Sequence, residues 1–330
     1  MKKILVITMT FLMMAGLCAG AVQAQEAGPA DVTVILDYVP NTNHTGMYIA
    51  LDKGYYAEEG LNVEIIEPTE GATNTLIAQN KGTFGISYQE DLTLAVTSED
   101  PLPLKAIAAL IQHNSSGFAT LEGSGINSPA DWEGKTYAGW GGPGESAVLK
   151  AVMIQNGADP DKLNVVVADG LGFESLGRAC DIMWYFEGWD CVQAEMAGVK
   201  LDYTPCYELD KRLDYYTPII VANDATLENN PELVKAFLRA TEKGYQDAIA
   251  DPDAAAEILY KYVPDYDLEM LKISQGILSP KYIDDAQAWG VMKDEVWDNY
   301  TDFMAEYGVI EETVPAADCY TNEFLPFIPE

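Results

Sequence analysis

Residues 37–46, with the sequence DYVPNTNHTG, follow an apolar, β-branched stretch and precede a predicted helix. They bring together a tyrosine ring, amide side chains, a carboxylate and an imidazole, beside a helix start whose free N–H groups can hold a ligand. We take Asp37, Tyr38, Asn43 and His44 as candidate ligand-binding residues. The alternative is a plain loop whose Asn and Thr side chains cap the following helix.

A second candidate segment, residues 139–145, reads GWGGPGE and also lies between a predicted strand and a predicted helix. Its glycines let backbone N–H groups come close to a ligand. Trp140 could stack on a planar ring, and Glu145 could accept hydrogen bonds from amino groups. The segment matches neither a phosphate loop nor a dinucleotide fingerprint, so no nucleotide cofactor is expected. The alternative is a tight turn with an ordinary glutamate at the helix N-terminus.

The densest run of aromatic residues is the third segment, 184–190, which reads WYFEGWD. Rings beside carboxylates suit a flat heterocycle with N–H donors, so we add Tyr185, Trp189 and Asp190 to the candidates. Here the alternative is a buried strand end. Tyr88 is included because it ends a short predicted strand, where ligands of α/β sheets bind.

The chain offers little for catalysis or metal binding. It has no GxSxG or HExxH motif, no CxxC pair, and no cysteine with an obvious local base. His44 and His113 are its only histidines, so a zinc site is not expected. A lone histidine in a binding loop is interpreted as a ligand contact. We therefore expect no catalytic residue, no metal and no cofactor.

Strands and helices alternate along the chain, which predicts an α/β fold with mainly parallel sheets and flanking helices. The predicted strands are 31–36, 60–66, 83–88, 134–139, 163–168 and 219–222. The predicted helices are 46–53, 73–79, 145–155, 231–249, 253–262 and 267–275.

Two breaks in this pattern, at 112–117 and 214–218, suggest that one lobe is interrupted by the other. Lobe 1 is then discontinuous and contains residues 25–114 and 218–330, while lobe 2 contains residues 115–217. The breaks form the hinge. Tyr88-Gln-Glu90, at the end of the third predicted strand, and Tyr215-Tyr216, at the second break, are expected to face the cleft between the lobes.

The first 24 residues are typical of a signal peptide. Lys2 and Lys3 precede an apolar stretch from Ile4 to Leu17, and the sequence AVQA favours cleavage after Ala24. Lipidation of Cys18 is the alternative. No later apolar stretch has the ~18 to 20 residues of a membrane helix, so we expect a soluble protein in the periplasm or another extracytoplasmic compartment.

The formal net charge of −33 becomes −35 when the two lysines of the predicted signal peptide are removed. Such an acidic surface repels phosphate backbones and anionic lipids, so nucleic acid is excluded as a partner. Four cysteines remain after cleavage, and they allow three complete pairings. They are Cys180, Cys191, Cys206 and Cys319. One local disulfide and a set of buried thiols both fit this spacing.

Two adjacent blocks carry a family resemblance. Residues 37–50, DYVPNTNHTGMYIA, and 53–65, KGYYAEEGLNVEI, resemble periplasmic binding proteins for thiamine pyrimidine precursors, which are relatives of the yeast-type pyrimidine synthase. The likeness extends to GSGI at 123–126, to the glycine-rich segment and to YTNEF at 320–324. Binders of sulfonate, nitrate and riboflavin share the second block.

The resemblance implies the two-lobed type II periplasmic-binding-protein fold, with a ligand held between lobes that close over it. It implies a monomeric substrate-binding protein of an ABC importer, with a permease as partner and an aminopyrimidine as ligand, of the hydroxymethyl- or formylaminomethyl-pyrimidine type. The positions that match the family motifs are Asp37, Tyr38, Asn43, His44, Glu145, Trp189 and Asp190.

Two departures bear on the ligand. Tyr38 stands where many relatives carry tryptophan, and Phe186-Glu187 replaces a more usual pair. Riboflavin or another heterocycle is therefore an alternative ligand, and a sulfonate a weaker one, because no arginine lies in a candidate segment. The synthases use a histidine corresponding to His44 and a cysteine-rich motif, whereas residues 213–218 read LDYYTP. A synthase remains the remote alternative.

Overall fold

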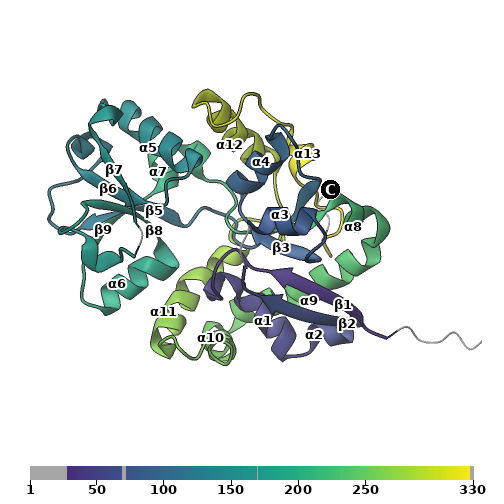
Figure 1. Ribbon diagram of the computed structural model, residues 1–330. Coiled ribbons are helices and arrows are strands. Elements are labelled where there is room, and N and C mark those ends of the chain that lie inside the picture. Colours follow the sequence, from purple (N-terminus) through teal and green to yellow (C-terminus); the bar gives the residue numbers. More distant parts are fainter. Residues whose placement is uncertain (1–27, 69–71, 169, 328–330) are drawn as a thin grey trace, which may run out of the picture.

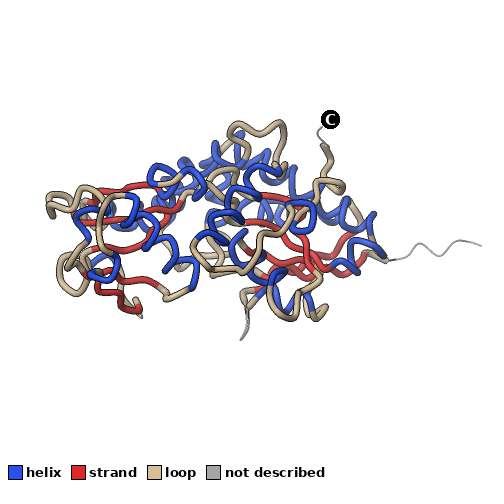
Figure 2. Tube along the Cα trace, turned by 90° about the horizontal axis from the view of Figure 1, so that it is seen from above, coloured by secondary structure: helices blue, strands red, loops and turns tan. Residues whose placement is uncertain are grey.

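The computed structural model describes residues 28–68, 72–168 and 170–327, and folds them into two lobes (Figure 1). Each lobe is built on one five-stranded sheet with helices around it. Seen from above, the two groups of strands are separated along the length of the molecule (Figure 2). The predicted signal peptide, residues 1–24, lies outside the described residues.

The first sheet has the strand order β2-β1-β3-β10-β4. Its strands are β1 (Ala30–Ile35), β2 (Leu61–Ile66), β3 (Phe84–Ser87), β4 (Leu104–Ala109) and β10 (Ile219–Asn223). β1 pairs with β2 and β3 in parallel, whereas β10 runs antiparallel to β3 and β4. The sheet therefore joins strands from before and after the second lobe.

The second sheet has the order β7-β6-β8-β5-β9. Its strands are β5 (Ser116–Leu121), β6 (Thr136–Gly139), β7 (Asn164–Val167), β8 (Ile182–Phe186) and β9 (Leu201–Pro205). β6 pairs in parallel with β7 and β8, and β5 runs antiparallel to β8 and β9.

The α/β fold with two lobes is confirmed, but the expectation of mainly parallel sheets holds for only half of the strand pairings. In each sheet, two pairings are parallel and two are antiparallel. The reason is topological. β5 and β10 follow the two crossings and begin at the hinge, so they run opposite to the strands that end there.

The predicted helices form with their ends displaced by a few residues. The helices are α1 (Thr45–Asp52), α2 (Tyr55–Glu58), α3 (Thr73–Ala78), α4 (Gln89–Thr97), α5 (Pro143–Gln155), α6 (Val192–Met196), α7 (Cys206–Leu209), α8 (Asp224–Asn229), α9 (Pro231–Ala250), α10 (Pro252–Tyr260), α11 (Leu268–Leu278), α12 (Asp294–Glu306) and α13 (Ala316–Cys319). No helix among the described residues is long and apolar enough to cross a membrane.

Helix α12 contributes to the hydrophobic cores of both lobes. Trp297 is buried with the lobe-1 residues Ile219 and Ala106, whereas Tyr300 and Phe303 are buried in the core around the second sheet. The four cysteines of the described chain are free thiols, and three of them are buried. No local disulfide therefore forms among them.

The close approach of α1 and α9 holds the end of the first candidate segment, residues 37–46. A Cβ on Gly244 would lie 1.9 Å from the carbonyl oxygen of Gly46, so the two helix backbones are nearly in contact. The neighbouring Tyr245 is fully buried, stacks on Trp289 and donates a hydrogen bond to the carbonyl of Asn43 at 2.7 Å. Helix packing thus holds this loop in place.

We predict that Gly244→Ala destabilises the protein by about 1 to 3 kcal/mol, because the added methyl group forces two backbones apart. Gly276→Ala is the control, since a Cβ there meets no atom within 4 Å and alanine favours a helix. Urea unfolding of both variants measures the difference. Equal unfolding free energies for Gly244→Ala and the native protein would show that the helix contact is not tight.

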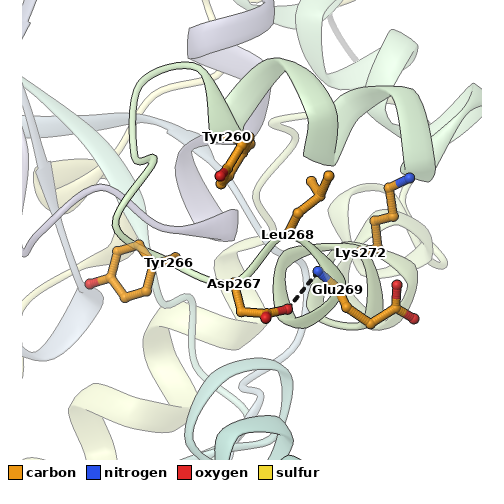
Figure 3. A pocket seen from close by; sticks show the side chains of 6 residues that line it. All are labelled: Tyr260, Tyr266, Asp267, Leu268, Glu269 and Lys272. Carbon is orange, nitrogen blue, oxygen red and sulfur yellow. Dashed lines mark hydrogen bonds between the residues drawn. The ribbon is translucent and has the colours of Figure 1, made fainter.

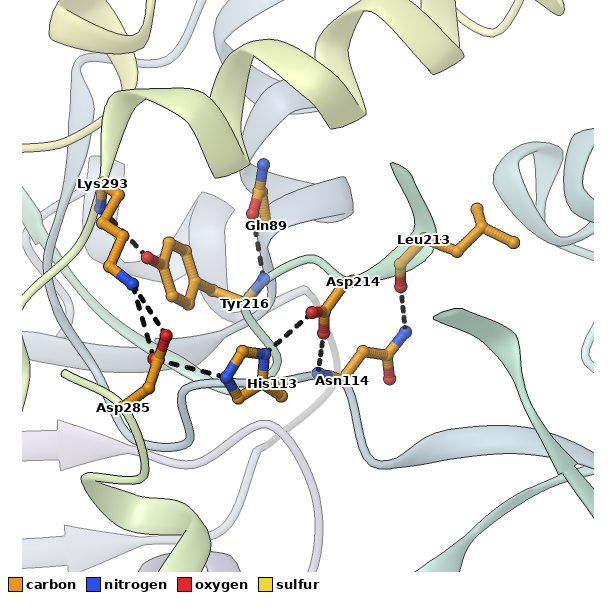
Figure 4. A network of polar contacts seen from close by, with 8 residues as sticks. All are labelled: Gln89, His113, Asn114, Leu213, Asp214, Tyr216, Asp285 and Lys293. Carbon is orange, nitrogen blue, oxygen red and sulfur yellow. Dashed lines mark hydrogen bonds and ion pairs between the residues drawn. The ribbon is translucent and has the colours of Figure 1, made fainter. Parts of the chain in front are cut away.

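The two crossings between the lobes are joined by a polar network (Figure 4). His113 in the first crossing contacts Asp214 in the second, with 2.8 Å between Nδ1 and Oδ2, and the backbone N–H of Asn114 donates to the same carboxylate at 3.0 Å. The other ring nitrogen of His113 lies 3.4 Å from Asp285, which is also paired with Lys293. The hydrogen bond to Asp214 raises the pKa of His113.

This network predicts a pH-dependent contribution to stability. Because the folded-state pKa of His113 is raised, its contribution is complete below the ordinary histidine pKa of about 6.5 and is lost as the pH rises through the folded-state pKa. His113→Gln should therefore lower the melting temperature more at about pH 5.5 than at about pH 8.5. Lys200→Gln, at an exposed pair in lobe 2, should show no such difference. A pH-independent effect of His113→Gln would contradict the prediction.

Candidate functional site

A cavity of about 460 Å³ lies between the lobes, at the hinge ends of β1, β3 and β8. Its lining includes seven aromatic residues and three carboxylates. The aromatic residues are Tyr38, Tyr88, Trp140, Trp184, Phe186, Trp189 and Tyr215, and the carboxylates are Asp37, Glu90 and Asp190. Among the described residues, no lysine, arginine or histidine lines it. The cavity suits a flat ligand that donates hydrogen bonds.

Of the ten predicted site residues, seven line this cavity and three do not. Those that line it are Asp37, Tyr38, Asn43, Tyr88, Trp140, Trp189 and Asp190. Those outside its lining are His44, Glu145 and Tyr185. Each of these three is held by contacts within the protein.

His44 lies beneath the first segment and is fully buried. Its Nδ1 accepts the backbone N–H of Asn41 at 3.2 Å, so the proton is on Nε2, which donates to Asp37 at 2.9 Å. Ligand binding by His44 stays a prediction, and the structure places the residue outside the cavity lining. Both ring nitrogens are already bonded, and the residue orients the Asp37 carboxylate at the cavity instead.

Glu145 organises the glycine-rich segment. One carboxylate oxygen accepts the Tyr137 hydroxyl at 2.5 Å and the N–H of Trp140 at 3.1 Å. The other accepts the N–H groups of Gly141 and Gly142 at 2.5 and 3.1 Å. The role of Glu145 as an acceptor for ligand amino groups stays a prediction, and in the structure its carboxylate has a structural role. It caps α5 and holds the loop from which Trp140 projects, half exposed, at the cavity.

Strand alternation explains why Tyr185 lies outside the cavity lining. Trp184 and Phe186 lie on the face of β8 that lines the cavity, so Tyr185 between them points to the opposite face. Its side chain is buried there, with its hydroxyl 3.0 Å from the sulfur of Met183. The tyrosine that was predicted belongs to the core, and its two neighbours face the cavity.

A π-helical turn, Glu187–Cys191, follows β8 and presents Trp189 and Asp190 to the cavity. Asp190 accepts the backbone N–H of Phe186 at 2.8 Å, which fixes its carboxylate. Burial raises the pKa of Asp190, and that hydrogen bond partly offsets the effect. The turn also reaches lobe 1, because the hydroxyl of Ser274 in α11 donates to the carbonyl of Gly188.

A shallow depression on lobe 1 lies beside this turn (Figure 3). Tyr266 from the depression meets Trp189 edge to face, with 5.1 Å between ring centroids. Asp267 accepts the backbone N–H of Glu269 at 2.8 Å and so serves as the N-cap of α11. Tyr266, at the edge of this depression, therefore packs against Trp189 in the wall of the cavity.

Glu90 and Tyr215 line the cavity although only their segments were expected at the cleft. Glu90 begins α4 directly after β3 and is 6% exposed. The hydroxyl of Tyr300 donates to Glu90 at 2.6 Å, and burial raises the pKa of this carboxyl. Its position in the first residues after a strand was the signal that could have identified it.

Two lobes joined by two crossings, with an aromatic cavity between them, define a periplasmic-binding-protein fold of type II. Residues 41–255 match the model of the family described as NMT1/THI5 like. This match covers more than half of the chain, which therefore belongs to that family.

Curated relatives include binding proteins and enzymes. The chain is 26% identical to the formylaminopyrimidine-binding protein of Halalkalibacterium halodurans, over 97% of this chain and 98% of the relative. It is 26% identical to the riboflavin-binding protein RibY of Chloroflexus aurantiacus, over 93% and 90%. It is 25% identical to the 4-amino-5-hydroxymethyl-2-methylpyrimidine phosphate synthase of Legionella pneumophila, over 90% and 93%.

Solved structures support the fold. The periplasmic aliphatic sulphonate binding protein SsuA of Escherichia coli superimposes with a TM-score of 0.68 over 88% of this chain and 97% of that chain, at 12% identity. The fold therefore persists where little of the sequence does.

We predict that Glu145→Ala destabilises the protein by about 1 to 2 kcal/mol, because it leaves three loop N–H groups and a buried hydroxyl without their acceptor. Glu195→Ala, an exposed glutamate in α6, should change stability by less than about 0.5 kcal/mol. Chemical unfolding of both variants tests this. If Glu145→Ala unfolds like the control, the carboxylate does not hold the loop.

Proposed function

We propose that this protein is the substrate-binding component of an ABC importer and captures a thiamine-precursor aminopyrimidine, of the hydroxymethyl- or formylaminomethyl-pyrimidine type. The observation that carries the proposal is the cavity itself, with its seven aromatic rings, its three carboxylates and no basic side chain among the described lining residues. An aminopyrimidine is flat and donates N–H groups, and both properties match this lining. The printed name of the formylaminopyrimidine-binding relative supports the same ligand class.

The arrangement of the rings supports capture by closure. Tyr38 and Tyr88 come from lobe 1, whereas Trp140 and Trp184 come from lobe 2. A ring bound between them gains the contacts of the second lobe only when the lobes approach, and this difference in affinity drives closure. We propose that residues 25–114 and 218–330 move as lobe 1 and residues 115–217 as lobe 2, about a hinge at the two crossings.

We propose that the protein binds its ligand without converting it. The histidine that the synthase resemblance points to, His44, is fully buried with both ring nitrogens bonded inside the protein. Residues 213–218 also lack cysteine. Export after cleavage near Ala24, action as a monomer and delivery to a membrane permease belong to the same proposal. The N-terminal sequence supports export, and the periplasmic-binding-protein fold supports a permease as partner.

The charge of the cavity discriminates between the alternative ligands. A sulfonate would face the acidic side chains Asp37 and Asp190 and would find no arginine among the described lining residues. Riboflavin is retained as the second candidate, because its planar ring suits the aromatic walls and a relative is named as its binder.

The test is calorimetry and thermal shift of residues 25–330 with aminopyrimidines, thiamine, riboflavin and aliphatic sulfonates. We expect an aminopyrimidine to raise the melting temperature. Tyr38→Ala and Trp140→Ala should each weaken its binding about tenfold, because each removes one stacking ring. Val167→Ala, at an exposed apolar residue outside the cavity lining, should leave binding unchanged. Binding of sulfonates alone would overturn the choice of ligand.

A further inference from the structure

Glu90 is the carboxylate of the cavity that lies where the two lobes meet. It belongs to α4 of lobe 1, and it is hydrogen-bonded to Tyr300 of α12. A Cβ added to Gly144 in the first turn of α5 would lie 2.2 Å from the carboxyl carbon of Glu90. The side chain therefore packs directly against lobe 2 and is buried between α4, α5 and α12 while it lines the cavity.

The groups that face Glu90 are acidic or neutral. Asp91 follows it on α4, and Glu145 lies beyond Gly144 on α5. Tyr300 faces it from α12 and Tyr215 from the second crossing. No salt bridge to Glu90 forms within the described residues. Burial and the neighbouring carboxylates therefore disfavour the charged form, and its pKa is raised.

We propose that Glu90 is the specificity-determining residue of the cavity, and that it binds a ring nitrogen and the adjacent amino group of the heterocycle through one shared proton. This inference rests on the proposed function. The carboxyl O–H donates to the ring nitrogen while its second oxygen accepts the amino N–H. If the proton moves to the ring nitrogen, the protonated ring donates to a Glu90 carboxylate, and the number of atoms and the total charge stay the same. In either form, the complex holds one proton more than an ionised Glu90 and a neutral ring together.

A carboxyl group at this position recognises one edge of the heterocycle by its hydrogen-bonding groups. A ring nitrogen that accepts, next to an amino group that donates, complements a carboxyl group at both positions. A flavin-type edge, in which an N–H lies between two carbonyls, can also pair with a neutral carboxyl, but its carbonyl oxygens are too weakly basic to take up the shared proton. Glu90 therefore favours aminopyrimidines over flavins, and the proton adds a dependence on pH.

The direction of this dependence follows from the proton count. Where one of the two free partners, the Glu90 carboxyl or the ring nitrogen, carries the proton and the other does not, the affinity is constant. Above the pKa values of both free partners, binding must take up a proton, so the affinity should fall by up to about tenfold per pH unit. Calorimetry in two buffers of different ionisation enthalpy should then detect proton uptake.

Glu90→Gln is the decisive variant, because the amide offers a fixed donor and acceptor in place of the shared proton. We expect it to bind the aminopyrimidine with an affinity that does not change with pH and with no proton uptake. Asp91→Asn is the matched control. It neutralises an adjacent, half-buried carboxyl whose pKa is also raised but which lies outside the cavity lining. It should keep both the fall in affinity with pH and the proton uptake, with the fall moved to lower pH because the Asp91 charge no longer raises the pKa of Glu90.

Tyr300→Phe provides a second, independent readout. Its hydroxyl stabilises the ionised carboxyl, so its loss should move the fall in affinity to higher pH. A native pH profile in Glu90→Gln would overturn the inference while leaving the proposed function intact. Failure of the native protein to bind any aminopyrimidine, at any pH between about 5 and 9, would overturn the proposed function and this inference with it.

Discussion

The structure depends on one topological constraint, which is that the chain crosses between the lobes twice. Because lobe 2 is inserted between β4 and β10, the hinge ends of the strands in both sheets face the same gap. Loops that follow β1, β3, β6 and β8 must then share one cavity, although they are far apart in sequence. The site requires no other device to bring its residues together, and its local contacts only set the direction of individual side chains.

Local chemistry sets those directions in a consistent way. His44 and Glu145, two residues with strong hydrogen-bonding groups, form their hydrogen bonds with other groups of the protein. They hold Asp37 and Trp140, which are the groups that reach the cavity. Preorganisation of this kind lowers the entropy lost on binding, because the exposed rings are already confined when the ligand arrives. Electrostatics adds a second constraint on the ligand, because the cavity is lined by acidic side chains and the chain as a whole carries a negative net charge.

Much of this arrangement could be predicted from the sequence. The segment 37–46 follows a β-branched strand, and its position after that strand placed it at the cleft. The sequence could not predict which side chains of β8 face the cavity. Residues Ile182–Trp184 are all apolar and buried on both faces of the sheet, so they show no alternation of polar and apolar residues. β4 was not predicted as a strand, because its sequence LKAIAA is rich in alanine, which has no preference for strands. The roles of His44 and Glu145 depended on contacts that spacing does not reveal.

Helix α12 has a mechanical consequence. Trp297 is held in one hydrophobic core and Tyr300, three residues later, in the other. The helix is therefore a third tether between bodies that the two crossings already connect. Both anchor points lie within one helical turn, about 5.4 Å along its axis. The closure proposed above would therefore disturb the packing of α12 least if its axis passed close to that turn, whereas twisting of one lobe against the other would separate the two clusters.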